Sequence, residues 1–351
     1  MNMRDNKKNI LEKPFEYFII NNRRYLGSKT KILEFIQNSI DKHIKKYDSF
    51  LDIFSGTGVV ANHFNKKNIK IITNDMLFSN YIIHYAFFSD DIYDEIRVLE
   101  LLDYLNNLIP TDNYFSESFG DKFFSLEVSR KIGAIREEIE KVTSKITKRE
   151  KYILITSLIY SIDKIANTCG HYDAFKKTSI MQNDFKLKPL SIDNESNVNN
   201  IILNADANKI IADIEEVDIL YLDPPYNSRQ YISAYHLIEN LAKWDKPEVE
   251  GVASKMVNRK EYNSDYCLKT AINAFGDLIN KAKAKYIILS YSDMAKKGND
   301  RSNARMSDAE IIDILEKKGK VFVESIKHKP FSTGKTNLSI HNERLFICQT
   351  Y

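Results

Sequence analysis

Short apolar runs alternate with amphipathic stretches over the first 88 residues of the chain. Residues 31–44 carry apolar side chains at helical spacing, whereas residues 50–54 and 70–73 are short apolar runs that are typical of buried strands. A further helix is expected after the first strand, beginning near Gly58. Because strands that are joined through a helix pair in parallel, this part of the chain predicts a parallel sheet.

The strand pattern fades after residue 90. Residues 92–108, 126–142 and 148–167 carry apolar stripes at helical spacing, which predicts three helices. The stretch 168–200 is polar and irregular, and such composition is typical of loops. This part of the chain is therefore expected to be mostly helical.

Strands and helices alternate again from residue 201 onward. Helices are predicted at 235–244 and 307–318. The predicted strands are 201–203, 217–222, 286–290, 321–326 and 344–349. The expected fold class is α/β, with one sheet-forming unit made of residues 1–90 and 201–351, interrupted by a mostly helical insertion of residues 91–200.

Composition and charge narrow the possible environments. The chain has 351 residues, 43% hydrophobic and 28% charged, which is typical of a soluble globular protein, and its net charge of +3 allows only a local basic face. Cys169, Cys267 and Cys348 show no metal-binding or disulfide spacing, so we expect a reducing compartment and no metal. No signal peptide and no run of 18 apolar residues is visible. The predicted location is the cytoplasm, without membrane contact.

A glycine turn follows the first predicted strand, in the stretch "LDIFSGTGVVANHF". Gly56 and Gly58 stand between a strand and a helix, where the backbone can approach a ligand closely. Asp75 follows the next strand, at a place suited to the hydroxyls of a ribose. The full GxGxxG pattern of a dinucleotide site is missing. A plain strand-to-helix turn with an exposed aspartate is the alternative interpretation.

S-adenosylmethionine (SAM) fits these features equally well, because it presents an adenosine without a pyrophosphate. In "RYLGSK", Tyr25, Gly27 and Lys29 precede a helix, where a ring and an ammonium group could flank a methionine carboxylate. In "LNADA", Asp206 ends a strand, where it could accept a hydrogen bond from an adenine amine. Ordinary surface roles for Lys29 and Asp206 are the alternative.

The stretch "YLDPPYNSRQY" ends a predicted core strand with two prolines, which cannot donate to a strand ladder. The carboxylate of Asp223 and the carbonyl of Pro224 are two acceptors close together, and Tyr226 offers a ring face for stacking. An amine that donates to both acceptors could aim its lone pair at an electrophile. This arrangement suits chemistry on the exocyclic amine of a base that has left the duplex. A rigid turn is the alternative interpretation.

With "DPPY", "DIFSGTG" and "YLGSK", the chain resembles the Dam-like, α-group adenine-N6 DNA methyltransferases. The stretches "NTCGHYDAF" and "YHLIENLAKW" resemble the branch that contains type IIS restriction-modification enzymes. The resemblance implies a Rossmann-like SAM-dependent methyltransferase sheet that ends in an antiparallel hairpin strand. It also implies a helical target-recognition insertion and direct methyl transfer to a flipped-out adenine. The implied partners are double-stranded DNA and a cognate restriction endonuclease encoded nearby.

The resemblance also assigns residues to the site. The chain departs modestly from the family's residue pattern at two positions. Tyr25 stands where some members have tryptophan, and Asp52 stands where some have glutamate. The implied cofactor site, for SAM with S-adenosylhomocysteine as product and no metal, contains Tyr25, Gly27, Lys29, Asp52, Phe54, Ser55, Gly56, Gly58, Asp75, Asp206 and Asp223. The implied catalytic residues are Asp223, Pro224, Pro225 and Tyr226.

Candidate DNA contacts combine basic, amide and aromatic side chains in irregular stretches. A solvated loop or a packing role near the active site is the alternative for each stretch, and Trp244 is expected to pack in a helix rather than to stack on a base. The candidates are His171, Tyr172, Lys176, Lys177, Asn227, Arg229, Gln230, Tyr231, Arg259 and Lys260.

Two other functions stay open at this point. The first is methylation of a different amine, on cytosine, RNA adenine or a glutamine side chain, although such enzymes more often carry Ser or Asn before the prolines. The second is a DNA-binding protein that keeps the fold without catalysis. The aspartate and tyrosine of "DPPY" and the predicted SAM features favour the adenine methyltransferase over both.

Overall fold

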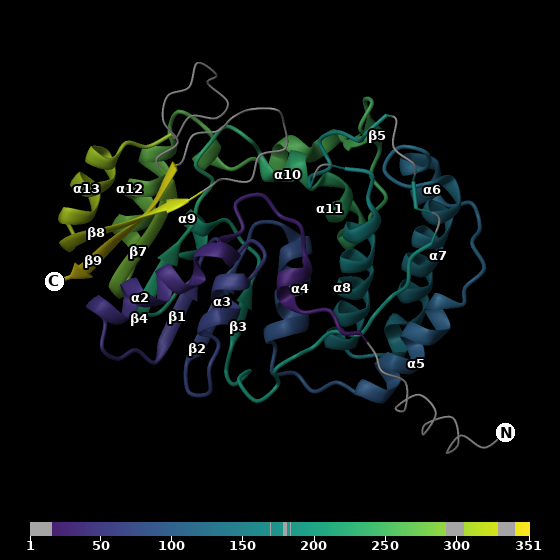
Figure 1. Cartoon of the computed structure of the whole chain (residues 1–351), viewed down its shortest axis with the longest axis horizontal. Coiled ribbons are helices and arrows are strands. Elements are labelled where there is room, and N and C mark those ends of the chain that lie inside the picture. The colour runs from purple at the N-terminus through teal and green to yellow at the C-terminus, as the bar shows by residue number, and fades with distance from the viewer. Residues whose placement is uncertain (1–15, 169, 178–180, 183, 293–304, 329–340) are drawn as a thin grey trace.

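The computed structural model describes residues 16–168, 170–177, 181–182, 184–292, 305–328 and 341–351. Its centre is a seven-stranded sheet in the order β3-β2-β1-β4-β7-β9-β8 (Figure 1). All neighbouring strands pair in parallel except for β9, which is antiparallel to both β7 and β8. The strands are β1 (Ser49–Asp52), β2 (Lys70–Asn74), β3 (Ile201–Leu203), β4 (Val217–Leu222), β7 (Ala284–Ser292), β8 (Gly319–His328) and β9 (His341–Thr350).

Helices lie on both faces of this sheet and extend beyond its β3 edge, on the right of Figure 1. A small antiparallel hairpin, β5 (Val249–Glu250) and β6 (Lys255–Met256), lies outside the main sheet. The helices are α2 (Leu33–His43), α3 (Val59–Phe64), α4 (Phe78–Phe88), α5 (Glu95–Asn106), α6 (Tyr114–Phe119), α7 (Leu126–Val142), α8 (Lys148–Ile165), α9 (Ala207–Ile210), α10 (Tyr231–Ala234), α11 (His236–Lys243), α12 (Ala271–Lys281) and α13 (Asp308–Glu316).

Two hydrophobic clusters cover the two faces of the sheet. Because side chains alternate along a strand, Phe50 and Ile219 belong to one cluster, and their neighbours Leu51 and Leu220 belong to the other. Helices α2, α3 and α4 supply the first cluster, and α9, α12 and α13 supply the second. Strands buried on both faces explain why the sequence shows continuous apolar runs rather than an apolar and polar alternation.

The insertion shares the first of these clusters. Apolar side chains of α5, α7 and α8 belong to it, and α8 packs against α4. Thr147 begins α8 with a capping box: its side chain accepts from the Glu150 backbone, and the buried Glu150 carboxylate accepts from the Thr147 backbone. None of the helices in the described ranges combines the length and the apolar composition of a membrane span. The division into a catalytic unit and a recognition insertion stays a prediction.

The predicted α/β class and the antiparallel hairpin strand are confirmed. Strands β3 and β4 and helix α7 match the predicted ranges residue for residue, whereas β7, β8 and β9 are longer than expected. Cys267 and Cys348 are buried thiols, and Cys169 lies outside the described residues. Trp244 is buried, as expected, against the guanidinium of Arg136.

Candidate active site

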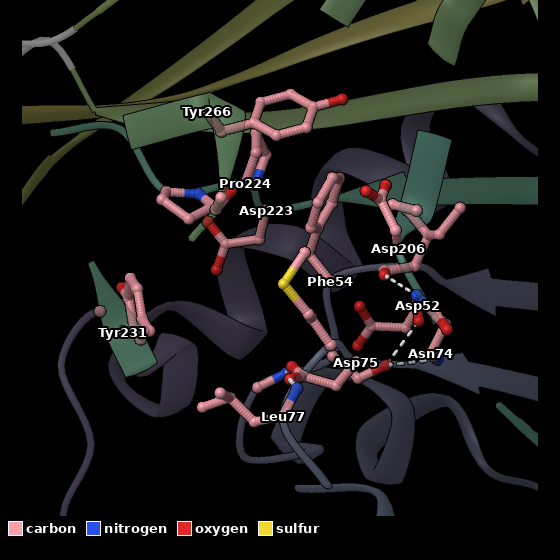
Figure 2. Close-up of a pocket in the computed structure, with 18 of the residues that line it drawn as sticks. Asp52, Phe54, Asn74, Asp75, Leu77, Asp206, Asp223, Pro224, Tyr231 and Tyr266 are labelled. Carbon is pink, nitrogen blue, oxygen red and sulfur yellow. Dashed lines mark hydrogen bonds between the residues drawn. The ribbon is translucent and has the colours of Figure 1, made fainter. Parts of the chain in front are cut away.

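A cavity of about 480 Å³ lies at the carboxyl ends of the parallel strands. Asp52 ends β1, Asn74 ends β2 and Asp223 follows β4, and all three line the cavity. Figure 2 shows Asp223 and Pro224 on one side of this space, and Asp52, Asp75 and Asp206 on the other. The strand order reverses direction between β1 and β4, and such a switch point is the usual ligand site of an open α/β sheet.

The cavity unites two groups of residues that lie far apart in the sequence. All the predicted cofactor residues line it except Gly58, and so do the four residues of the "DPPY" motif. Their individual roles stay predictions. The lining residues from both groups are Tyr25, Gly27, Lys29, Asp52, Phe54, Ser55, Gly56, Asp75, Asp206, Asp223, Pro224, Pro225 and Tyr226.

Asp75 holds the glycine turn in place. One oxygen of its carboxylate accepts from the Gly56 amide at 2.9 Å, and the other accepts from the Leu77 amide at 2.8 Å. Gly56 needs its glycine because its φ is +51° and the Tyr25 ring lies 3.3 Å from where a Cβ would be. Burial raises the pKa of Asp75 to about 6. The aspartate is thus integrated into the turn rather than exposed on the surface.

Gly58 has a packing function at the start of α3. Its φ is +77°, and a Cβ at this position would lie 2.9 Å from His84 Cδ2 and 3.0 Å from Ile20 Cδ1. The glycine therefore allows α3 to pack closely against α4 instead of lining the cavity itself.

Replacing Gly58 with alanine is expected to lower the free energy of unfolding by about 3 kcal/mol, through backbone strain and overpacking together. Gly251 is a matched control, because its φ is +71° and nothing lies within 4 Å of its Cβ position. Gly251→Ala is expected to cost only the backbone part, about 1 kcal/mol. Denaturant midpoints of the two variants measure the difference. Equal losses would contradict the packing function.

Asp52 lines the cavity and contains one buried, unpartnered carboxylate oxygen. Only 1% of this residue is exposed, and its Oδ1 has no hydrogen-bond partner among the described residues. Burial, with the charges of Asp223 and Asp75 added, holds the pKa of Asp52 well above its usual range. A buried acceptor without a donor is costly, so this oxygen suits a ligand that brings an N–H group.

Asp206 and two aromatic rings form a further part of the cavity wall. Asp206 begins α9, and its carboxylate accepts from the Asn208 amide at 2.9 Å. The Tyr266 ring meets the Phe54 ring edge-on at 5.0 Å, and its hydroxyl donates to the Asn208 side chain. Tyr266 was not predicted, because it lies in a short 3-10 turn that carries no periodic signal.

The "DPPY" motif follows β4, as expected from its prolines. The Asp223 Oδ1 lies 2.9 Å from Lys29 Nζ. Burial raises the pKa of Asp223 to about 6, even though Lys29 lowers it. Tyr226 lines the cavity beside Asp223, with its ring edge-on to Tyr291 at 6.4 Å. The strand end thus places a carboxylate and an aromatic ring at one side of the cavity.

Lys29 lines the cavity and is paired with two carboxylates of the protein itself. Its Nζ lies 2.9 Å from Asp223 Oδ1 and 2.8 Å from Glu343 Oε1. The expected contact of its ammonium group with a methionine carboxylate stays a prediction.

An aromatic wall closes the cavity beside the "YLGSK" stretch. The Tyr25 ring stacks on Tyr235 with centroids 4.4 Å apart, and Tyr231 lies 5.4 Å from Tyr25. The buried guanidinium of Arg23 lies over the Tyr25 ring and 3.6 Å from Asp163 on α8. The insertion therefore helps to hold the wall of the cavity.

Three candidate DNA contacts are engaged within the protein. Tyr172 is only 2% exposed, and its hydroxyl donates to Asp163 at 2.6 Å. The Gln230 amide bonds twice to the Ser264 backbone, at 3.1 and 2.8 Å. The Tyr231 hydroxyl donates to the Leu26 carbonyl at 3.3 Å, and its ring lines the cavity. These hydrogen bonds hold the three side chains within the protein, and their predicted contacts with DNA stay predictions.

The other candidates lie nearer to solvent. Arg259 is half-buried and pairs with Glu250 at 2.7 Å. His171 and Asn227 are half-buried as well, and Asn227 accepts from the Arg229 amide. The exposed candidates are Lys176, Lys177, Arg229 and Lys260.

The chain belongs to the family of D12 class N6 adenine-specific DNA methyltransferases, which matches residues 25–300. It is 34% identical to modification methylase StsI of Streptococcus sanguinis and 33% identical to type II methyltransferase M.FokI of Planomicrobium okeanokoites, over 93% of the chain in each case. It covers 55% and 52% of those proteins, so the chain spans about half the length of these two relatives. It is also 32% identical to type II methyltransferase M.NlaIII of Neisseria lactamica, over 90% of the chain and 95% of that protein.

Proposed function

We propose that this chain is a site-specific DNA adenine-N6 methyltransferase that acts as the modification enzyme of a restriction-modification system. The observation that carries the proposal is that one cavity of about 480 Å³ is lined both by Asp52, whose Oδ1 is unpartnered, and by the Asp223 to Tyr226 motif. A methyl donor and a base amine can meet in one such space, shielded from water. Family membership supports the adenine amine as the acceptor.

The residues present fit SAM as the cofactor. The unpartnered Asp52 Oδ1 suits its ammonium group, Asp75 suits the ribose hydroxyls, and Asp206 beside Phe54 suits the adenine. Gly56 lets the turn adopt a positive φ against the Tyr25 ring at the cavity wall. When bound, SAM supplies an electrophilic methyl group, whose bond to sulfur breaks with the electron pair left on the sulfur. Among the described residues, no cluster of three or more His, Cys, Asp or Glu side chains has a metal-binding arrangement.

The chain's own residues orient the attacking amine. Asp223 and the Pro224 carbonyl accept the two N–H bonds of the adenine amine, which directs the nitrogen lone pair out of the ring plane. Tyr226 stacks on the flipped base. As the new carbon–nitrogen bond forms, the nitrogen becomes cationic and releases one proton. The Asp223 carboxylate is the nearest base, and it passes that proton on to water.

Double-stranded DNA is the proposed substrate, with the insertion of residues 91–200 as the target-recognition region. The exposed side chains of Lys176, Lys177, Arg229 and Lys260 are proposed to contact phosphates. A net charge of only +3 suits such a local basic face. A cognate endonuclease and a cytoplasmic location complete the proposal, and relatives whose names are those of modification and type II methyltransferases support it.

The function is tested by incubating the purified chain with methyl-labelled SAM and with long duplex DNA of varied sequence, so that the unknown recognition sequence is included. We expect label in N6-methyladenine, identified by mass spectrometry of the digested DNA. Label in cytosine or in RNA would support the other-amine alternative, and DNA binding without transfer would support the non-catalytic one. Single-molecule sequencing of the methylated DNA then reads the recognition sequence.

A further inference from the structure

Glu343 is a buried carboxylate that the catalytic motif does not include. It lies on β9, where it is paired in register with Ser292 of β7. Its Oε1 accepts from the Ser290 hydroxyl at 3.0 Å and from Lys29 Nζ at 2.8 Å. The same Lys29 Nζ lies 2.9 Å from Asp223 Oδ1. One ammonium group from near the start of the chain thus joins two carboxylates that follow much later in the sequence.

We propose that Glu343 is a positioning residue for methyl transfer: it holds Lys29, and Lys29 in turn holds the Asp223 carboxylate ionised and oriented toward the substrate amine. This inference rests on the proposed function, because Asp223 must accept from that amine. It also gives the antiparallel strand β9 a function in catalysis, since β9, which pairs with β7, brings Glu343 within hydrogen-bond distance of Lys29.

The geometry accounts for the orientation. Lys29 occupies one oxygen of the Asp223 carboxylate, Oδ1, which leaves the other oxygen to accept from the amine. Lys29 itself is 6% exposed and lies at the start of a short 3-10 turn, Lys29–Ile32. A flexible ammonium needs a second anchor to stay on one oxygen, and Glu343 supplies that anchor. Ser290 fixes Glu343 in turn.

The electrostatics of the cluster make the proposal testable. Burial lowers the pKa of Lys29, but Asp223 and Glu343 together raise it well above its usual range, so Lys29 is charged at any working pH. Burial raises the pKa of Asp223 to about 6, Lys29 lowers it, and the negative charge of Glu343 raises it. Removing Lys29 and removing the charge of Glu343 should therefore move this pKa in opposite directions.

The other titratable groups around Asp223 are not expected to produce these opposite shifts of its pKa. Burial raises the pKa of the phenols of Tyr221, Tyr226 and Tyr231, so all three are neutral near pH 7. Asp52, on β1, has its pKa held well above its usual range. Lys29 and Glu343 are thus the two charges whose removal should dominate the ionisation of Asp223.

The test is the pH dependence of single-turnover methyl transfer for the wild type, Lys29→Met and Glu343→Gln. For Lys29→Met, the acidic limb of the pH–rate profile should move to higher pH by about one unit or more, because Asp223 loses its neighbouring cation. The transfer rate at pH 7 should therefore fall about tenfold. For Glu343→Gln, the limb should move to lower pH, because the amide still accepts from Lys29 but carries no charge. Opposite shifts are the expected signature.

Control measurements separate this signature from general damage. Glu324 on β8 pairs with Lys42 of α2 at 2.6 Å outside the cavity lining, so Glu324→Gln is the matched variant and should leave the profile unchanged. Calorimetric affinity for SAM should stay within about twofold of the wild type in both test variants. Weakened SAM binding with an unshifted profile in Lys29→Met would instead indicate a cofactor contact and overturn the proposal.

Glu343→Gln keeps the size and a hydrogen bond of the original side chain, so it tests the proposal even when Lys29→Met fails to fold. An acidic limb that stays in place or moves up in Glu343→Gln would overturn the positioning function. Wild-type protein that transfers no methyl group would refute the proposed function itself. Wild-type transfer without the opposite shifts would refute only this inference.

Discussion

Replacing Asp223 with alanine is expected to lower the single-turnover rate of methyl transfer at least about 10³-fold, because the amine loses its charged acceptor and its nearest base. SAM affinity should stay within about twofold. The fold should survive, since Lys29 keeps its 2.8 Å contact with Glu343 and is not left as an unpaired buried charge. Quench measurements with labelled SAM give the rate, and calorimetry gives the affinity.

Two further variants sharpen that result. Asp223→Asn keeps the shape but not the charge, so it should still be at least about 10²-fold slower than the wild type. Asp213→Ala removes an exposed aspartate outside the cavity lining and should transfer methyl groups at the wild-type rate. Unchanged transfer by Asp223→Ala would remove the carboxylate from the mechanism.

Replacing Asp75 with alanine is expected to raise the Kd for SAM at least about tenfold. Two losses combine: the backbone amides of Gly56 and Leu77 lose their acceptor, and the proposed contact with the ribose hydroxyls disappears. Isothermal titration calorimetry measures the affinity directly. At saturating SAM, the rate of methyl transfer by Asp75→Ala should be much closer to the wild-type rate than its SAM affinity is to the wild-type affinity. The reason is that Asp75 does not touch the reacting amine.

The matched control for Asp75 is Asp193, an exposed aspartate outside the cavity lining that also accepts from a backbone amide, that of Ser196. Asp193→Ala should bind SAM as the wild type does. Wild-type affinity in Asp75→Ala would show that the glycine turn holds the cofactor without its aspartate.

Most of the strands could be predicted because a buried parallel strand has a local signature. The run at 217–222 is apolar on both faces except for Asp218, and the prolines that follow it end it. The run at 201–203 is apolar throughout, although its strand lies at the edge of the sheet and is partly exposed. Helix α4 was not predicted, because it is buried nearly all round and contains buried Ser79, Asn80 and His84, so its apolar positions show no amphipathic period. Helix α12 was also missed, although Phe275, Leu278 and Ile279 follow helical spacing.

Contacts between distant segments account for the surroundings of candidate site residues that sequence reasoning could not give. Tyr172 lies in a polar, basic stretch, which suggests a surface, yet Asp163 and the Phe123 ring enclose it. Gln230 is a typical base-reading side chain, but the backbone of Ser264 satisfies both ends of its amide. In each case a partner far along the chain decided where the side chain lies, and a single sequence carries no record of that partner.

The sequence by itself determined the order of strands and helices, the glycine turn and the "DPPY" motif, because backbone preferences and apolar runs act over a few neighbouring residues. Only the tertiary structure decided which charges meet. Lys29 and Glu343 are 314 positions apart, and the antiparallel placement of β9 brings them together. An ion pair needs proximity in space, and folding alone supplies it, so the cluster at Asp223 could be found only in the folded protein.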